Sequence, residues 1–506
     1  MGPVQKNQVL LFHPRSAQSK HRVPNSILQV AASVNGKYTC HFVDGNLEKD
    51  PWTKIEQYLS TGNIKYFGTT VMPGPQLHQA IPISRQIKLK YPLITQIWGG
   101  YFPSNHYQAV LTSGYIDYVI DGPGDHAFPL LLEALEQETP LNAVPNLIFK
   151  TDHGQILRTS RSELTDQDAL PPYPYDYYNT FYPINKYLAA TFLGSRTMAY
   201  HSSMGCPFKC AFCAVVPIYA ARWKGKSARR IFEDIIDLKN KYQINAIEFH
   251  DNNFFVSEKR VAEFSSLITP HQIAWWGEAR IDTVDQFSDE TLSLMRRSGC
   301  KMIFFGAESG NDQLLNFMDK GGKQTGEQIT RFADRIKTFD IIPEFSFVLG
   351  FPARGNQTVE DQITEEIAFI KKIKEINPAT EIIIYIYSPV PTEGSKLYTE
   401  ITKNGFRFPQ TLEDWLAPSW TNFDLRKNPL TPWLNAKIIR KIQNFETVLN
   451  AYYPTVSDTK ITPGQRRIIS ALSAWRYYLN FYAFPYELKF LLKYWLRYRQ
   501  PQEEGF

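Results

Sequence analysis

The chain has 506 residues, of which 43% are hydrophobic and 21% are charged, and its formal net charge is +5. This length exceeds one ordinary hydrophobic core, so two or three domains are expected. The mild charge excludes the dense basic surface of a nucleic-acid-binding protein, and no apolar run approaches the roughly 20 residues of a membrane span.

The cysteine content indicates a reducing compartment. Three of the five cysteines fall within eight residues, which leaves Cys40 and Cys300 as a distant pair. This distribution argues against a disulfide framework. The N-terminus also lacks a basic stretch followed by an apolar one, so we expect no signal peptide and a cytoplasmic protein.

Residues 1–150 alternate apolar runs with helical patterns. The five apolar runs occupy residues 9–12, 38–43, 64–71, 93–98 and 115–120. Buried strands alternating with helices predict a parallel, doubly wound α/β sheet, whose ligands bind beyond the carboxyl ends of the strands. Polar residues and glycines follow three of these runs, at Gly68, Thr69 and Thr70, at Gly99, Gly100 and Tyr101, and at Asp121, Gly122, Gly124 and Asp125. They suit close approach of a flat ligand, although ordinary βα turns use the same residue types.

Residues 151–195 are expected to form a connector. A short β-hairpin is predicted from residues 146–150 and 155–158. The following segment, residues 170–178, is rich in proline and tyrosine. Proline is expected to exclude helix there, and the tyrosines supply packing area. We predict a semi-rigid tether lying across both domains.

The densest motif places Cys206, Cys210 and Cys213 at spacings of four and three residues. Three thiolates on a four-iron cluster leave one iron without a protein ligand, which makes that iron reactive. Structural zinc is an alternative, but it needs a fourth ligand such as His201, and the sequence has no second CxxC pair. Three buried free thiols are the other alternative.

The spacing, with Phe212 before the last cysteine, resembles the signature of radical S-adenosylmethionine (SAM) enzymes. The resemblance implies a [4Fe-4S] cluster held by Cys206, Cys210 and Cys213, with SAM chelating the open iron. It also implies a (β/α)6 partial barrel over residues 196–395. Six apolar runs suit the barrel strands, at residues 197–200, 246–249, 273–276, 302–305, 344–349 and 381–387.

Catalytic groups of barrels gather at the carboxyl ends of the strands. Motifs similar to those of the family stand at these ends, and they imply a SAM site that comprises Phe212, Asp251, Arg280, Glu308, Ser309 and Gly350. Asp251 would meet the amino group, Arg280 the carboxylate, and Glu308 a ribose hydroxyl or the amino group. The chain departs from the family at residues 354–358 and 391–395. Taken singly, each charged residue could equally be a solvated or capping group.

Residues 1–150 resemble the cobalamin-binding domain found upstream of radical SAM domains. The resemblance assigns cobalamin contacts to Thr69, Thr70, Gly99, Gly100, Tyr101, Gly122 and Gly124. The family's Asp-x-His-x-x-Gly motif is replaced after the first run by a segment that contains His13. This implies either cobalamin bound without a histidine ligand or a degenerate domain that binds none.

Residues 396–506 are expected to be a helical substrate or accessory region. Helical spacing covers residues 433–452, and basic residues interleave with Trp, Tyr and Leu from Arg466 to Arg497. Two interpretations stay open, a helix packed on the core with a solvated basic face, or peripheral contact with an anionic membrane. No cysteine follows Cys300, which argues against auxiliary clusters in this region.

The resemblance as a whole implies a cobalamin-dependent radical SAM C-methyltransferase that acts on a small-molecule or lipid-like substrate. A flavodoxin- or ferredoxin-type protein would donate the electron. A radical SAM oxidative cyclase of the tetrapyrrole type is the alternative enzyme, and a non-catalytic iron–sulfur or cobalamin-binding scaffold is the alternative from another class.

Overall fold

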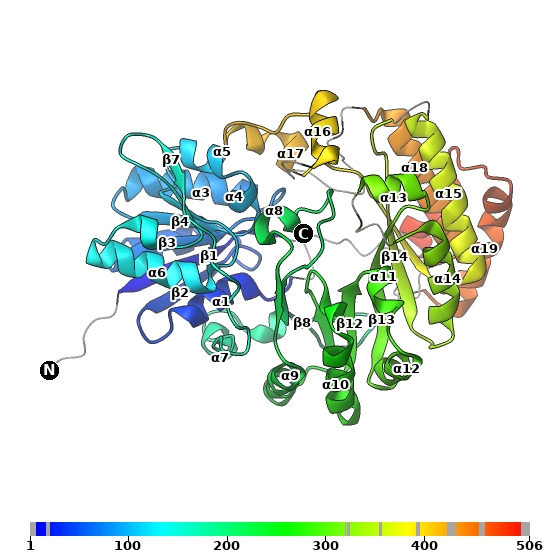
Figure 1. Cartoon of the computed structure of the whole chain (residues 1–506), viewed down its shortest axis with the longest axis horizontal. Coiled ribbons are helices and arrows are strands. Elements are labelled where there is room, and N and C mark those ends of the chain that lie inside the picture. Colours follow the sequence, from blue (N-terminus) through cyan, green and yellow to red (C-terminus); the bar gives the residue numbers. More distant parts are fainter. Residues whose placement is uncertain are drawn as a thin grey trace.

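The computed structural model describes residues 7–16, 21–318, 320, 324–353, 357–390, 395–421, 431, 433–454 and 461–496. Two α/β units lie side by side, and helices α18 (Ala436–Tyr452) and α19 (Pro463–Tyr478) flank the second unit on the side away from the first (Figure 1). Within the described residues, no helix has both the length and the apolar character needed to cross a bilayer.

The first unit is built on a seven-stranded sheet with the order β2-β1-β3-β4-β5-β6-β7. Its first five strands are parallel, as predicted, and the hairpin β6–β7 extends the sheet in antiparallel fashion. The strands are β1 (Gln8–His13), β2 (Thr39–Asp44), β3 (Ile64–Thr70), β4 (Thr95–Gly99), β5 (Tyr118–Ile120), β6 (Leu147–Lys150) and β7 (Ile156–Arg158). The helices are α1 (Asn25–Ser33), α2 (Pro51–Leu59), α3 (Leu77–Lys90), α4 (Tyr101–Asn105), α5 (Tyr107–Thr112), α6 (Gly124–Gln137) and the 3-10 turn η1 (Leu141–Ala143).

The connector contains a helix that proline was expected to exclude. Helix α7 (Tyr175–Asn179) begins directly after Pro174, and the turn η2 (Ile184–Lys186) follows. Proline interrupts a helix interior but is tolerated ahead of the first turn, so the expectation was wrong on this point. The tyrosines pack as expected, because the hydroxyls of Tyr178 and Tyr187 both reach the buried carboxylate of Asp44.

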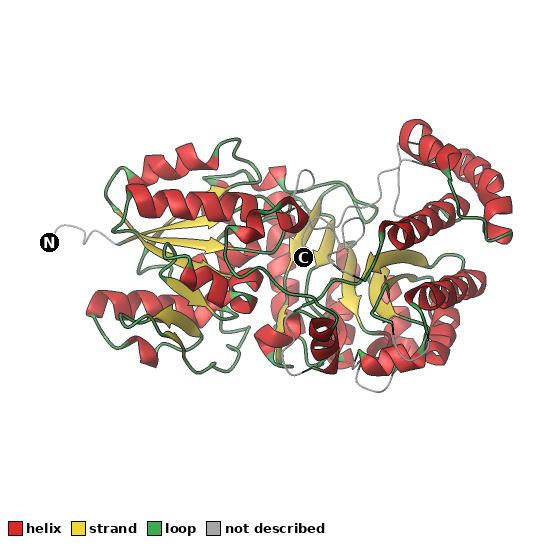
Figure 2. Cartoon of the chain, turned by 90° about the horizontal axis from the view of Figure 1, so that it is seen from above, coloured by secondary structure: helices red, strands yellow, loops and turns green. Residues whose placement is uncertain are grey.

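The second unit is a six-stranded, all-parallel sheet with the order β15-β14-β13-β12-β11-β8. The strands are β8 (Thr197–Tyr200), β11 (Ala246–Phe249), β12 (Ala274–Ala279), β13 (Cys300–Glu308), β14 (Ile342–Leu349) and β15 (Glu381–Ile386). Its helices are α9 (Ala228–Tyr242), η3 (Phe254–Val256), α10 (Glu258–Ile268), η4 (Thr269–His271), α11 (Ile281–Val284), α12 (Asp289–Arg297), α13 (Asp312–Phe317), α14 (Gly326–Lys337) and α15 (Val359–Ile376). The view from above shows both sheets with their helices (Figure 2).

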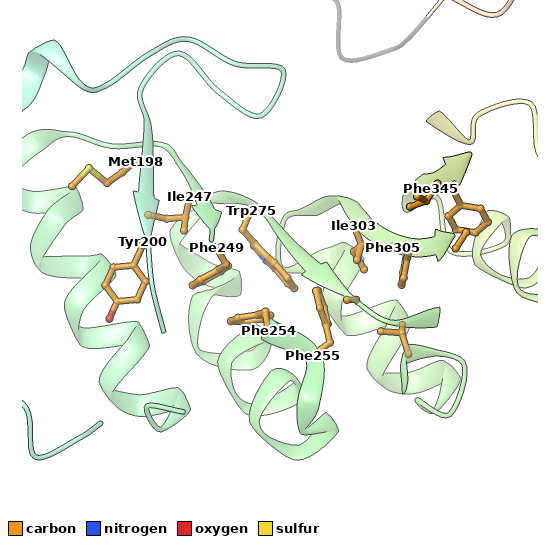
Figure 3. Packing of buried hydrophobic residues seen from close by; sticks show 14 of the residues in the cluster. Met198, Tyr200, Ile247, Phe249, Phe254, Phe255, Trp275, Ile303, Phe305 and Phe345 are labelled. Atoms are coloured by element: carbon orange, nitrogen blue, oxygen red, sulfur yellow. The ribbon is translucent and has the colours of Figure 1, made fainter. Parts of the chain in front are cut away.

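Alternating side chains give the barrel strands two different faces. One face carries Phe249, Trp275, Phe305 and other large apolar side chains, which pack beneath the strands against the helices (Figure 3). The opposite face is more polar, since Trp276 donates from its indole Nε1 to Glu344 on β14 at 3.3 Å. The core therefore lies between sheet and helices.

The C-terminal region contacts both units, because Leu412 and Trp415 join a buried cluster of the first unit and the later helices pack on the barrel helices. Its elements are α16 (Lys396–Lys403), η5 (Asp414–Leu416), α17 (Pro418–Thr421), α18 (Ala436–Tyr452), α19 (Pro463–Tyr478), α20 (Tyr486–Phe490) and the π-helical turn η6 (Leu491–Trp495). Helix α18 lies against α15, and α19 lies against α18 on the outer side (Figure 1).

Candidate cluster and cofactor site

The three clustered cysteines lie on the loop that follows β8. A two-stranded ribbon, β9 (Ser203–Gly205) with β10 (Trp223–Gly225), closes the base of this loop, and α8 (Val215–Tyr219) follows the last cysteine. Gly205 has φ +77, and a Cβ there would lie 2.2 Å from the carbonyl oxygen of Arg222. The ribbon therefore requires glycine immediately before Cys206.

Two cations stand close to the thiols. Arg280 donates from Nη1 to Cys210 Sγ at 3.0 Å and places its guanidinium 4.0 Å from the centre of the Phe208 ring. Burial raises the pKa of Cys206, and the charges of Arg280 and Lys320 oppose that rise. Burial also raises the pKa of Cys213 to about 12. Cations beside thiols favour thiolates, the form that binds iron.

The thiol loop suits a polynuclear cluster in its chemistry. In the described part of the chain, no three His, Cys, Asp or Glu side chains are arranged to hold a single metal ion. A four-iron cluster calls for another arrangement, because each thiolate binds a separate iron. Three thiols on one short loop, backed by Arg280 and Lys320, fit this requirement.

Asp251 lies at the end of β11, and its carboxylate is completely buried. It accepts hydrogen bonds from the backbone N–H groups of Ser202 and Ser203 at 2.6 and 3.2 Å, and from the Ser202 hydroxyl. Arg260 stands 4.0 Å away. Asp251 thus fixes the start of the cysteine loop, and its predicted contact with the SAM amino group stays a prediction.

Arg280 follows β12 and is also engaged within the protein. Its guanidinium donates to both oxygens of Asp282, at 2.9 and 2.7 Å, and to the carbonyl oxygen of Lys320. The fork predicted for the SAM carboxylate is therefore held by Asp282. The remaining contact of the Arg280 guanidinium, to Cys210 Sγ, faces the thiol loop.

Glu308 ends β13 in a left-handed conformation with φ +65. Its carboxylate pairs with Lys320 Nζ at 2.9 Å, and the same ammonium donates to the Gly306 carbonyl oxygen at 2.8 Å. Both side chains are buried, and buried charges require such pairing. Non-glycine residues at positive φ are uncommon in proteins as a whole, but they cluster at functional sites.

Ser309 is fully buried beside Glu366 of α15. Its hydroxyl donates to one Glu366 oxygen, and the Gly310 N–H donates to the other at 3.0 Å. Burial raises the pKa of Glu366 to about 7, although both hydrogen bonds oppose the rise. The Glu366 carboxylate, which is distant in sequence, therefore holds the turn after β13 through Ser309 and Gly310.

Gly350 follows β14 with φ +87 and is covered by the C-terminal region. Its carbonyl oxygen accepts from Trp433 Nε1 at 2.9 Å, and a Cβ at this position would lie 2.8 Å from Leu434. Tyr387 stacks between Phe351 and Trp433, with ring centres 4.3 and 6.2 Å away. The segment before α18 thus closes this side of the barrel end. The neighbouring predicted turns at residues 354–356 and 391–394 lie outside the described residues.

The predicted cobalamin residues lie at the carboxyl edge of the first sheet. Thr69 is buried and donates from its hydroxyl to the Phe12 carbonyl oxygen at 3.0 Å. Gly100 has φ 96 and ψ −170, and a Cβ there would lie 2.9 Å from Thr70 Oγ1. At Gly99 a Cβ would meet only Ile120, at 3.9 Å. Gly100 is thus required by the turn, whereas Gly99 leaves open space beside the edge.

Ser104 joins the ends of β4 and β5, and the sequence did not single it out. Its hydroxyl donates to the Gly100 carbonyl oxygen at 2.8 Å and accepts from the Gly122 N–H at 3.0 Å. Gly122 has φ +95, and Gly124 begins α6. His13, at the end of β1, is half-buried, and desolvation lowers the pKa of its imidazole.

The two predicted site regions meet at α8. A Cβ at Gly122 would lie 3.5 Å from Ile218 of α8. The pKa of Tyr101 is raised mainly by burial, and the nearby charge of Cys213 raises it further. Arg161 pairs with Asp121 of the first unit and donates to the Pro217 carbonyl oxygen at 2.6 Å. The edge of the first sheet therefore faces the cysteine loop.

Five further residues complete the site, and their partners are distant in sequence. They are Ser104, Arg161, Lys320, Glu366 and Trp433. Two of them lie near a sequence motif, Ser104 three residues after Tyr101 and Lys320 twelve residues after Glu308. The others had no signal beyond ordinary helix or loop patterns.

Residues 200–364 match the Radical SAM superfamily. The chain thus carries a radical SAM domain, with the barrel and cysteine loop described above. It is 26% identical over 377 residues to an uncharacterized methyltransferase, PH0819, of Pyrococcus horikoshii, covering 72% of this chain and 78% of that protein. It is also 26% identical over 248 residues to the anaerobic magnesium-protoporphyrin IX monomethyl ester cyclase of Synechocystis, covering 48% of this chain and 47% of the cyclase.

The fold extends beyond the matched domain. The solved structure of OxsB, a cobalamin-dependent S-adenosylmethionine radical enzyme with aqua-cobalamin bound, covers 97% of this chain and 73% of its own with a TM-score of 0.69 at 15% identity. Both α/β units and the C-terminal helices therefore follow one known arrangement. The predicted fold class is confirmed.

Proposed function

We propose that the protein is a cobalamin-dependent radical SAM methyltransferase that acts on an unactivated carbon of a small molecule. The observation that carries the proposal is the meeting of the cysteine loop with the glycine-containing edge of the first sheet at α8. A radical-forming centre and a methyl carrier must lie on opposite sides of one substrate, and this arrangement brings their predicted sites together.

The bound groups would supply one-electron cleavage of a sulfonium and a transferable methyl group. The chain's own residues bind and orient. Cys206, Cys210 and Cys213 would hold the iron, and Arg280 and Lys320 would compensate its thiolate charge. Asp251 positions the loop through Ser202 and Ser203. We assign the SAM contacts to Phe212, Arg280, Glu308, Ser309 and Gly350, with Asp251 behind them.

For cobalamin, Gly99, Gly100, Tyr101, Gly122, Gly124 and Thr70 are proposed to form the contact edge, with Thr69 supporting it from β3. Closure of the barrel end by Trp433 would exclude water from a reactive intermediate. We further propose a flavodoxin- or ferredoxin-type electron donor. The domain boundaries at residues 150, 195 and 395 remain our proposal.

The test is anaerobic reconstitution with iron, sulfide and hydroxocobalamin, followed by SAM and a reductant. We expect S-adenosylhomocysteine from methyl transfer to cobalamin, together with 5′-deoxyadenosine. The triple variant Cys206→Ala, Cys210→Ala, Cys213→Ala should give no 5′-deoxyadenosine. Absence of 5′-deoxyadenosine from the wild-type protein would instead favour a scaffold.

An oxidative cyclase is the second candidate, since the chain aligns with 47% of the Synechocystis cyclase. The longer alignment, over 78% of the Pyrococcus methyltransferase, favours methyl transfer. Production of 5′-deoxyadenosine without S-adenosylhomocysteine would reverse this order.

A further inference from the structure

The end of the described chain carries most of the exposed large hydrophobic side chains of the described residues. Fifteen large hydrophobic side chains lie exposed on the described residues, and eleven of them fall between Ile468 and Trp495. Single exposed hydrophobic residues are ordinary, whereas a cluster marks an interaction surface. We call this cluster the terminal aromatic surface, and it comprises Ile468, Leu472, Trp475, Tyr478, Leu479, Phe481, Phe484, Tyr486, Phe490, Tyr494 and Trp495.

Helix α19 has two apolar faces, of which the protein uses one. Ile469 and Tyr477 are buried toward α18. A second stripe, Leu472, Trp475 and Leu479 with Ile468, repeats at spacings of four, three and four residues and is 49–71% exposed. A helix that merely covered a core would carry polar residues there.

The exposed stripe belongs to an anchored helix. Tyr477 stacks on Tyr452 of α18 with ring centres 4.5 Å apart, and Lys371 of α15 donates to the Tyr477 carbonyl oxygen at 2.9 Å. Arg476 pairs with Glu487 and so ties α19 to α20. The helix lies at the edge of the molecule farthest from the first sheet (Figure 1). The surface is thus presented outward on a fixed support.

The charge around this surface is positive. Residues 461–496 contain five basic residues and one acidic residue, Glu487, which is paired with the buried Arg476. Arg467, Lys489 and Lys493 are exposed among the aromatic residues. Trp and Tyr favour the boundary between hydrocarbon and water, and cations there meet lipid phosphates.

We propose that the terminal aromatic surface docks the protein peripherally on an anionic lipid bilayer. The aromatic and leucine side chains would enter the headgroup boundary, and Arg467, Lys489 and Lys493 would contact phosphates. This combination favours a bilayer over a protein partner, because lysine is depleted in protein interfaces. The inference is independent of the reaction proposed above.

The experiment is co-sedimentation of the full-length protein with vesicles of phosphatidylcholine alone, or of phosphatidylcholine and phosphatidylglycerol in equal parts. Wild-type protein should bind the anionic vesicles, less at high salt, and should bind neutral vesicles weakly. The variant Arg467→Gln, Lys493→Gln should bind about thirtyfold more weakly, because each cation near an anionic surface contributes about 1 kcal/mol of binding free energy. The variant Leu472→Gln, Trp475→Gln, Leu479→Gln should bind at least about tenfold more weakly.

The matched control is Leu89→Gln, Leu93→Gln, which removes side chains that are 78% and 93% exposed on the first unit. It should bind as the wild type does, and the melting temperatures of all variants should agree. Two results would overturn the proposal. One is unchanged binding of the leucine and tryptophan variant, and the other is self-association in sedimentation velocity that this variant abolishes without any vesicle binding.

Discussion

At the scale of the residue, the site is organised by charge. Arg280 and Lys320 stand beside the thiols, and each is itself held by a carboxylate, Asp282 or Glu308. Because buried charges need partners, these pairs keep two cations in place before any cofactor binds. Removal of a thiol should therefore affect iron binding while the surrounding pairs persist.

Replacing Cys210 with alanine should reduce bound iron and sulfide to near zero in the reconstituted protein. Cys300→Ala is the matched control, because Cys300 is equally buried but begins β13 away from the loop. It should keep the full iron content and lose about 1 kcal/mol of stability from the small cavity. Iron and sulfide analysis measures the cluster content of each variant, and thermal melting measures its stability. Equal loss of iron in both variants would contradict the assignment.

Glu366 predicts a specific dependence of stability on pH. Its pKa is about 7 in the folded chain and 4.5 for the free side chain, so the folded state binds more protons between these values. Stability must then fall as pH rises through this window, by linkage. Glu366→Gln should flatten the decline in melting temperature between pH 4.5 and 7. A slope as steep as in the wild type would show that other groups cause it.

At the scale of the element, the turn from β4 to α4 separates two glycines with different tasks. Gly100→Ala should cost about 1–3 kcal/mol, since its backbone conformation is accessible essentially to glycine alone. Gly99→Ala should leave melting of the cofactor-free protein unchanged, because a Cβ there has room. If Gly99 contacts cobalamin as proposed, the same substitution should weaken cobalamin binding in a spectroscopic titration. Normal cobalamin affinity would remove Gly99 from the site.

At the scale of the whole molecule, Arg161 links the first unit to the cysteine loop. Arg158 and Arg161 both pair with Asp121, and Arg161 in addition donates to the Pro217 carbonyl oxygen. Arg161→Gln should therefore slow methyl transfer from SAM to cobalamin by about tenfold or more, because misplacement by about 1 Å can cost that much. Arg158→Gln should have a smaller effect, and both variants should retain iron. Equal rates for the two variants would exclude a positioning role.

Strand alternation and motif spacing are local patterns, so the sequence alone predicted the parallel strands of both sheets and the cysteine loop. The bounds of two strands agree to the residue, with residues 197–200 and 246–249 predicted and observed as β8 and β11, whereas β13 extends beyond the predicted residues 302–305. The packing of distant elements was needed to show that Asp251 holds Ser202, that Glu366 holds Ser309, and that α19 exposes a second apolar stripe. The reason is physical. A side chain's type limits which partners it can take, whereas the partner it finds depends on which distant elements pack beside it.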